Sequence, residues 1–176
     1  YMTRRDFWKS IAAVPAAAAQ VYAERTRGLP PLTIKEVKVI GTSPNLFPWV
    51  LVKVITSEPG LYGIGSANNL MHPFAVVDVI EKNYGPFWVG KSVDRVEDMW
   101  QATSVRSYFR NGMLQNAALS AIDTALWDIK GKRAGMPVHA LLGGKVRDAI
   151  SLYAHADGRD LESLEQSVRK QTEAGY

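Results

Sequence analysis

The alternation of apolar and polar side chains in the first half of the chain predicts three strands. Residues 32–41 alternate apolar with charged positions, and residues 49–56 (WVLVKVIT) form a run rich in β-branched side chains. Ser57–Gly60 is typical of a turn, and residues 61–66 (LYGIGS) follow as a third strand, whose two glycines indicate a close approach of another backbone. Because the connections are short, we expect an antiparallel meander.

Helical spacing replaces this alternation beyond residue 70. Pro73 suits a first helical turn, and the helix that it opens is expected to stop at Gly85-Pro86. Asp94, with Glu97 three residues later, resembles a capping box at the start of a second helix that reaches about Tyr108. The expected inward stripes are Phe74, Val77, Ile80 and Tyr84 in the first helix and Val96, Met99, Trp100 and Thr103 in the second.

A third helix, from about Ala118, carries small residues three and four positions apart. Such a stripe lets another backbone approach closely, and Gly135 followed by Pro137 predicts where the helix ends. On its own this pattern indicates only a well-packed helix, and Asp123 and Asp128 are interpreted as structural side chains on its other faces. The stripe comprises Ala117, Ala118, Ala121 and Ala125 with Ile122, Leu126 and Ile129.

The pattern changes again after Gly144. A short β run at residues 149–154 (AISLYA) leads through a loop to Asp160, which can cap a further amphipathic helix. One strand, one loop and one helix form the opening unit of a (β/α) barrel. We therefore expect an α+β domain, with a three-stranded meander and helices, over residues 30–144, followed by the start of a modified TIM barrel over residues 145–176.

The composition is ordinary for a globular protein, with 47% hydrophobic and 22% charged residues in a chain of 176. The net charge of +4 includes Arg4, Arg5 and Lys9 near the beginning. No Lys/Arg run interleaved with aromatic residues follows, so a nucleic-acid partner is not expected. Because the sequence contains no cysteine, disulfides and thiolate metal sites are excluded within it.

The first residues resemble a twin-arginine export signal. The pair Arg4-Arg5 precedes a weakly hydrophobic, alanine-rich run at residues 10–19, and Ala17–Ala19 or Val21–Ala23 would suit a small-residue cleavage site. Such signals address proteins that are exported already folded, so residues 1–25 are set apart from the fold. The apolar run is shorter than the roughly 20 residues of a membrane span. The alternative is an amphipathic or disordered N-terminal tail on a cytoplasmic protein.

The order of residue types in the third helix is more specific than packing requires. From Ala118 to Gly143 the chain reads ALSAIDTALWDIKGKRAGMPVHALLG. This stretch resembles, without departure, the first sequence signature of the mandelate racemase/muconate lactonizing enzyme family, which belongs to the enolase superfamily. The resemblance extends from about Leu32 to Tyr176. It implies an α+β capping domain that covers the mouth of a modified α/β barrel.

The resemblance also implies a reaction. In this family a Lys, His, Arg or Tyr base removes the proton alpha to a carboxylate, and a divalent metal, usually Mg²⁺, stabilises the ene-diolate. The base and the carboxylate metal ligands lie on later barrel strands. We therefore expect them beyond Tyr176 and expect no catalytic or metal-binding residue in the present sequence. The family is often oligomeric, which implies a homo-oligomer for the full-length protein.

Within the family, Tyr153–Gly158 (YAHADG) resembles the Tyr-Gly-His-Ala-Asn-Gly segment of the sugar-acid dehydratases, a branch that includes mannonate and gluconate dehydratases. The resemblance implies that His155 contacts the substrate at the C-terminal end of the first barrel strand. Ala154 and Asp157 depart from the Gly and Asn of that segment. Without the resemblance, His155 would be interpreted as a hydrogen-bonded loop residue.

A second match follows the third strand. Residues 65–70 (GSANNL) stand where the branch often has Gly-Asp-Ala-Thr-Leu-Asn, whose last Asn reaches the substrate. Asn68 and Asn69 come one or two places early and are the candidate substrate contacts, with Leu70 at the matching place. Asparagine also suits a turn for conformational reasons alone. The loop that ends at Trp49 matches the other mobile loop of the cap, and Trp49 itself is interpreted as a core aromatic at a strand end.

Three hypotheses follow. The first is the N-terminal part of a Mg²⁺-dependent sugar-acid dehydratase that takes a small-molecule carboxylate, with a racemase or cycloisomerase of the same family as the nearest alternative. The second is a non-catalytic binding domain, whose exposed apolar face and unpaired strand edges would need a covering partner. The third is a truncated product without a function of its own.

Overall fold

The computed structural model describes residues 17–44, 47–67, 71–106, 108 and 110–176. Their contacts form two compact units, one that ends at Gly144 and one from Lys145 to Tyr176. The first unit begins with a helix over residues 17–25 and continues into a sheet covered by helices. Within the described part of the chain, no helix is both long enough and apolar enough to cross a membrane.

The sheet of the first unit is the predicted antiparallel meander. Strand β1 (Ile34–Thr42) pairs with β2 (Trp49–Thr56), which in turn pairs with β3 (Tyr62–Ser66). Side chains of a strand point alternately to the two faces of its sheet, so every second residue of the central strand is buried. The buried residues of β2 are Val50, Val52, Val54 and Thr56.

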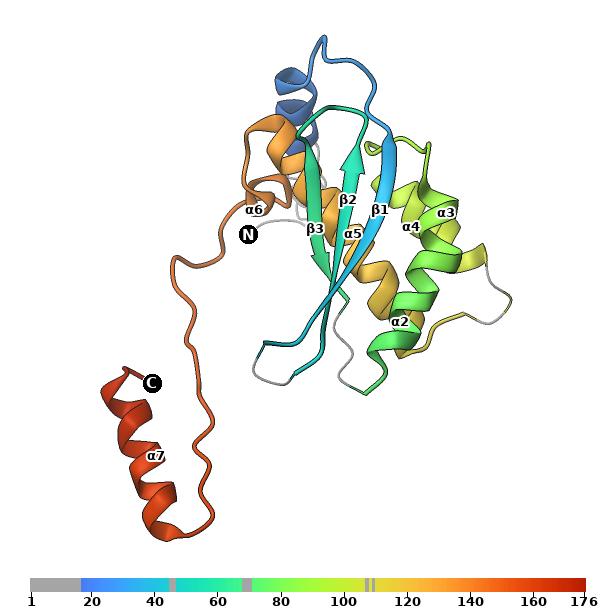
Figure 1. Cartoon of the computed structure of the whole chain (residues 1–176). Coiled ribbons are helices and arrows are strands. Elements are labelled where there is room, and N and C mark those ends of the chain that lie inside the picture. Colours follow the sequence, from blue (N-terminus) through green and yellow to red (C-terminus); the bar gives the residue numbers. More distant parts are fainter. Residues whose placement is uncertain (1–16, 45–46, 68–70, 107, 109) are drawn as a thin grey trace, which may run out of the picture. The chain divides into compact units, whose positions relative to one another are not determined.

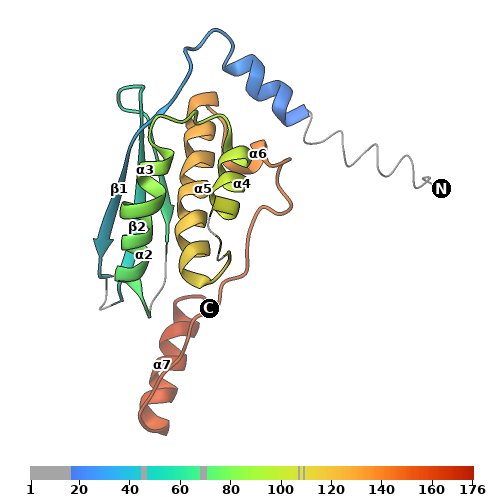
Figure 2. The ribbon, with the colours of Figure 1, turned by 90° about the vertical axis from the view of Figure 1, so that its right-hand side faces the viewer.

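Helices α2 to α5 cover one face of this sheet (Figures 1 and 2). The helical elements are α2 (Pro73–Val79), the π-helical turn η2 (Ile80–Tyr84), α3 (Gly85–Trp88), α4 (Val96–Arg106), α5 (Met113–Ala134) and α6 (Val138–Leu141). Helix α5 lies against β2 and β3, and α3 packs on β1. The core between sheet and helices is mainly aliphatic, and its largest fully buried side chain is that of Trp88.

The closest approach in the core joins α5 to β3. A Cβ atom placed on Gly63 would lie 1.9 Å from the carbonyl oxygen of Ala125, and one on Gly65 would lie 1.8 Å from that of Ala121. Both alanines are fully buried. The glycines of the third strand and the alanine stripe of the third helix therefore face each other, which confirms both predictions of a close backbone approach. Helix α5 ends at Gly135 in the left-handed conformation (φ 60°), as expected.

Two charged side chains of α5 also fix it to β3. Asp128 Oδ2 accepts a hydrogen bond from the backbone N–H of Ile64 (3.0 Å) and pairs with the Lys132 ammonium (2.7 Å). Lys132 donates in addition to the carbonyl oxygen of Tyr62 (2.9 Å). Asp128 thus has a structural role, as the sequence indicated.

The segment after Pro73 differs from the prediction. The helical path does not stop at Gly85-Pro86, because the π-helical turn η2 leads directly into α3 and Pro86 stands in the first turn of α3, where no N–H is required. The inward residue of α2 is Val76, whereas Phe74 is 85% exposed. The predicted stop and the inward position of Phe74 are therefore wrong.

Helix α4 keeps most of its predicted inward stripe. Val96, Met99 and Thr103 are buried, but Trp100 is 39% exposed because it stands about 100° around the helix from Met99. Asp94, predicted to cap this helix, uses its carboxylate differently. Its two oxygens accept hydrogen bonds from Tyr22 and Arg133, so the helix begins without the expected capping box.

The second unit contains one helix, α7 (Leu161–Glu173). The helix begins as predicted at Asp160, whose Oδ1 accepts a hydrogen bond from the backbone N–H of Ser163 (2.8 Å) in a capping box. No strand is present over residues 149–154, where the sequence predicted one. The reason is that a barrel strand is defined by hydrogen bonds to its neighbours, and the described residues of this unit contain no other strand.

Candidate functional site

Two loops match parts of the cap that the resemblance places beside the substrate, and the elements that flank them end or begin at the same end of the sheet. Strand β1 ends there and β2 begins there, and β3 ends there before α2 begins, as Figures 1 and 2 show. An open groove of about 470 Å³ runs between the β1–β2 connection and the start of α2. Its lining consists of Gly41, Thr42, Ser43, Pro48, Trp49, Val50, Pro73, Phe74 and Val77.

Trp49 links the two loops. Its indole Nε1 donates a hydrogen bond to Ser66 Oγ (2.9 Å), which joins the first residue of β2 to the last residue of β3. The side chain is 38% exposed, so the interpretation of Trp49 as a core aromatic is wrong. The strand alternation explains this position, because Val50, the next residue, takes the buried face. No sequence pattern indicates the bond to Ser66.

Large apolar side chains are exposed around the groove. Phe74 contributes to the lining, and Phe47 (60% exposed) and Met71 (80% exposed) belong to the two loops. An exposed apolar surface of this kind is shielded from water only when another part of the protein covers it. In the family that the sequence resembles, the cap covers the mouth of the barrel. The lining residues with polar side-chain atoms are Thr42, Ser43 and Trp49, and the indole nitrogen of Trp49 is bonded to Ser66.

Four residues singled out from the sequence lie outside the described residues. They are the candidate substrate contacts Asn68 and Asn69 and the arginine pair Arg4 and Arg5. Asn68 follows directly after Ala67, whose N–H donates to the carbonyl oxygen of Val50 (2.8 Å). Contact of either asparagine with a substrate stays a prediction.

His155 lies in the second unit, on the extended segment before α7, and is exposed. Its ring packs edge-to-face against Tyr153, with ring centroids 5.3 Å apart and an angle of 81° between the planes. Its carbonyl oxygen accepts a hydrogen bond from Gln171 Nε2 (3.4 Å), whereas its imidazole nitrogens make no hydrogen bond with a described residue. The backbone of His155 is therefore held while its side chain can donate to or accept from a ligand.

The turn after His155 is tightly packed on α7. A Cβ atom on Gly158 would lie 2.3 Å from the backbone nitrogen of Leu164, so this position requires glycine. The N–H of Asp157 donates to Ser167 Oγ (3.3 Å), and the N–H of Arg159 donates to Ser163 Oγ (3.0 Å). The segment YAHADG is thus anchored by its backbone to the helix that follows it.

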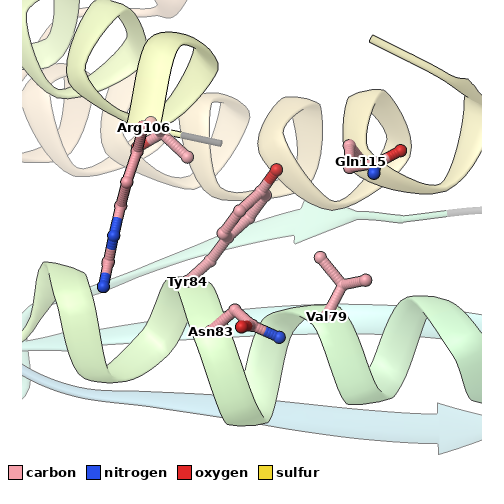
Figure 3. Close-up of a pocket in the computed structure, with 6 residues that line it drawn as sticks. Val79, Asn83, Tyr84, Arg106 and Gln115 are labelled. Carbon is pink, nitrogen blue, oxygen red and sulfur yellow. The ribbon is translucent and has the colours of Figure 1, made fainter. Parts of the chain in front are cut away.

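A second cavity, of about 330 Å³, lies between η2, α4 and α5 (Figure 3). Tyr84 extends from η2 toward the helices across the cavity, and burial raises the pKa of its phenol above the usual value of 10. The Arg106 guanidinium lies 4.3 Å from the ring centre of Phe87, and Thr103 Oγ1 accepts a hydrogen bond from Trp88 Nε1 (2.8 Å). These groups serve helix packing, and the lining offers no pair of titratable groups suited to proton transfer.

The described residues do not form a magnesium site. Nowhere among them do three His, Asp or Glu side chains come close enough together to hold a metal ion. Asp128 is committed to Ile64 and Lys132, and Asp94 is committed to Tyr22 and Arg133.

A three-stranded antiparallel meander with helices on one face, followed by an extended segment and a helix, defines the capping domain and barrel entry of an enolase-superfamily protein. Comparison with known families agrees. Residues 22–143 match the N-terminal domain of mandelate racemase/muconate lactonizing enzyme, and the chain belongs to this family.

Relatives are similar along most of this chain but are much longer. The D-galactonate dehydratase family member RspA of Pantoea ananatis is 51% identical over 145 residues, which cover 82% of this chain and 35% of the relative. A D-galactonate dehydratase family member of Enterocloster bolteae is 47% identical over 82% of this chain and 36% of its own. The chain thus spans about a third of the length of these curated relatives.

Solved structures show the same architecture. An enolase from Pantoea ananatis, crystallised with bound D-gluconate and Mg, is 51% identical and superimposes with a TM-score of 0.77 over 82% of this chain and 35% of its own. A putative mandelate racemase from Bordetella bronchiseptica, complexed with 2-oxoglutarate/phosphate, is 29% identical with a TM-score of 0.71 over 82% of this chain and 42% of its own.

Proposed function

We propose that this chain is the capping domain and barrel entry of a Mg²⁺-dependent sugar-acid dehydratase. The observation that carries the proposal is the 51% identity to members of the D-galactonate dehydratase family over 82% of the chain. A relative crystallised with D-gluconate and Mg supports a sugar acid as the substrate class. The base and the metal ligands would belong to the part of the protein that this chain does not contain.

The proposed reaction removes one molecule of water from a hydroxy acid. A base takes the proton alpha to the carboxylate, the β-hydroxyl group leaves with a second proton, and the resulting enol becomes a 2-oxo-3-deoxy acid. Bound Mg²⁺ would supply positive charge next to the carboxylate as negative charge develops there. This chain would contribute substrate recognition. The groove beside Trp49, together with Asn68 and Asn69 from the connection between β3 and α2, would bind the distal hydroxyl groups. The imidazole of His155 would bind a hydroxyl or carboxylate oxygen.

The test uses the full-length gene product, Mg²⁺ and a panel of aldonates and other hydroxy acids. Formation of a 2-oxo acid with matching loss of substrate supports the dehydratase. Running the same panel in D₂O separates the nearest alternative, because a racemase would place deuterium at the α-carbon without losing water. His155→Asn should raise KM for the active substrate, whereas His139→Asn, at an exposed position of α6, should leave KM unchanged. No turnover of any hydroxy acid would refute the proposal.

We propose in addition that the protein is exported by a twin-arginine route. The pair Arg4-Arg5 and the alanine-rich run after it support this address. Replacing both arginines by lysine should retain the protein in the cytoplasm, and cell fractionation with an antibody would show it. A parent protein found only in the cytoplasm would refute export. Light scattering on the purified full-length protein tests the expected homo-oligomer.

A further inference from the structure

The helix over residues 17–25 belongs to the folded cap, although the export signal would overlap with it. The hydroxyl of Tyr22 donates a hydrogen bond to Asp94 Oδ1 (2.5 Å), and the phenol is half-buried. The other oxygen of Asp94 pairs with Arg133 Nη1 (3.1 Å) of α5, whose side chain is only 5% exposed. Burial and the Asp94 carboxylate raise the pKa of Tyr22, so the phenol stays a hydrogen-bond donor at physiological pH.

Arg25, in the same helix, caps the C-terminal end of α5. Arg25 Nη1 donates to the carbonyl oxygens of Ala134 (3.0 Å) and Gly135 (3.1 Å), at the C-terminus of α5. The last carbonyls of a helix lack partners within it and carry partial negative charge, so a guanidinium is well suited to them. Tyr22 and Arg25 are named the N-terminal clip below, because one residue reaches the start of α4 and the other the end of α5.

Hydrolysis at the two candidate cleavage sites would affect the N-terminal clip differently. Hydrolysis after Ala23 would remove Tyr22 and leave Asp94 without one of its two donors. Hydrolysis after Ala19 would keep Tyr22 and Arg25 together. Tyr22, directly before Ala23, is further held by the hydroxyl of Thr26, which donates to its carbonyl oxygen (2.8 Å), whereas the methyl side chain of Ala19 can make no hydrogen bond.

We propose that a signal peptidase hydrolyses the Ala19–Gln20 peptide bond, adding one water molecule, and that the N-terminal clip stays in the mature protein. The proposal rests on the proposed export. Twin-arginine substrates cross the membrane folded, so the clip would form before the peptidase acts. Proteases need a scissile segment that can leave the fold, and the segment at Ala23 is tied to the cap through the side chain and the carbonyl oxygen of Tyr22.

The first experiment is the intact mass of the exported full-length protein. A mature chain that begins at Gln20 supports the assignment, and one that begins at Glu24, or an exported chain that keeps its leader, overturns it. A protein confined to the cytoplasm refutes export and the processing site with it. These outcomes are independent of dehydratase turnover, so failure of the enzymatic proposal is recognised separately.

The second experiment measures the clip itself. Leaderless full-length proteins that begin at Gln20 and at Glu24 are compared by thermal unfolding, and the shorter one should melt about 2 °C lower. Arg25→Ala should lower the melting temperature by a similar amount. Arg27→Ala is the matched control, because the Arg27 side chain makes no hydrogen bond or ion pair with the described residues, and it should have no effect. Identical melting of the two leaderless proteins would show that Tyr22 does not stabilise the mature fold, and an unchanged melting temperature for Arg25→Ala would show the same for Arg25; the two results together would refute the clip.

Discussion

Substituting Gly65 by alanine tests the packing on which the cap is built. A Cβ atom at this position would lie 1.8 Å from the carbonyl oxygen of Ala121 and 3.0 Å from its Cα. Ordinary contact begins near 3.4 Å, so α5 and β3 would have to separate by roughly 1.6 Å, the difference between 3.4 and 1.8 Å. The obstacle is backbone, so a change of side-chain rotamer cannot relieve it.

The cost follows from what the separation disturbs. Overpacking a core usually costs 1–3 kcal/mol, occasionally more. Here the movement also stretches the 3.0 Å hydrogen bond from Ile64 to Asp128 and opens the contact between Gly63 and Ala125. We therefore expect Gly65→Ala to lower the free energy of unfolding by about 4 kcal/mol, near the upper limit for a single substitution.

Urea denaturation, followed by tryptophan fluorescence and far-UV circular dichroism, measures this loss. With a slope near 2 kcal/mol per molar urea, the midpoint should fall by about 2 M. Gly41→Ala is the matched control: Gly41 also lies in a strand, but a Cβ atom there meets nothing within 4 Å. Its free energy of unfolding should change by less than about 0.5 kcal/mol.

Two results would refute this reasoning. The first is a Gly65→Ala midpoint within experimental error of the parent, with an unchanged slope. The second is rescue of Gly65→Ala by Ala121→Gly, because removing the Ala121 methyl group leaves its carbonyl oxygen in place. Rescue would mean that side chains, not backbones, meet at this point.

Three further predictions concern single side chains. Burial and the nearby Glu97 carboxylate raise the folded-state pKa of Asp123 above its usual 3.8, so its charge opposes folding once the pH exceeds that value. Asp123→Asn should therefore raise the melting temperature at pH 7, and the difference should vanish as the pH falls toward 3.5; a gain that persists in acid would contradict this cause. Asp128→Ala removes the acceptor of the Ile64 N–H and should cost about 1 kcal/mol in urea denaturation, since the carboxylate is partly exposed, whereas Asp128→Asn, which keeps an acceptor oxygen, should cost less. Trp49→Phe removes the hydrogen bond to Ser66 at the groove and should raise KM for the sugar acid about fivefold with kcat unchanged and the melting temperature lowered by only about 2 °C; an unchanged KM would remove the groove from the substrate site.

The close backbone approaches and the helix ends could be predicted because they depend on residues that are near one another in the sequence. The glycines of β3 and the alanine stripe of α5 each indicate close approach of a backbone, and the structure adds that the two elements approach each other. The Asp160 capping box and the Gly135 helix end are likewise determined within four residues. The helix end expected at Gly85-Pro86 was wrong because the π-helical turn η2 continues directly into α3, where Pro86 stands in the first turn. No residue type indicates a π-helical turn in a sequence.

The candidate site depended on contacts between distant residues, which a sequence pattern does not contain. Asp94 has the spacing of a helix cap, but Tyr22 and Arg133 lie 72 and 39 positions away and occupy its carboxylate. Trp49 has the large apolar side chain expected of a core residue, but its indole nitrogen donates a hydrogen bond to Ser66 at the surface. His155 could be singled out only through its resemblance to a known segment, because an exposed histidine after an extended run has no distinctive pattern of its own.

The pairing of α5 with β3 has a consequence for how the cap behaves beside other proteins. An outer strand normally presents a row of unpaired N–H and C=O groups that can recruit a strand from another molecule. Asp128 accepts from the Ile64 N–H and Lys132 donates to the Tyr62 carbonyl oxygen, so these two groups of β3 cannot pair with a strand of another molecule. On the other side, the backbone of Ile34 in β1 is already bonded to Gly90 and Lys91. At these positions the sheet cannot pair edge to edge with another molecule, and charge reversal at Lys132 would free the Tyr62 carbonyl oxygen to accept from another chain.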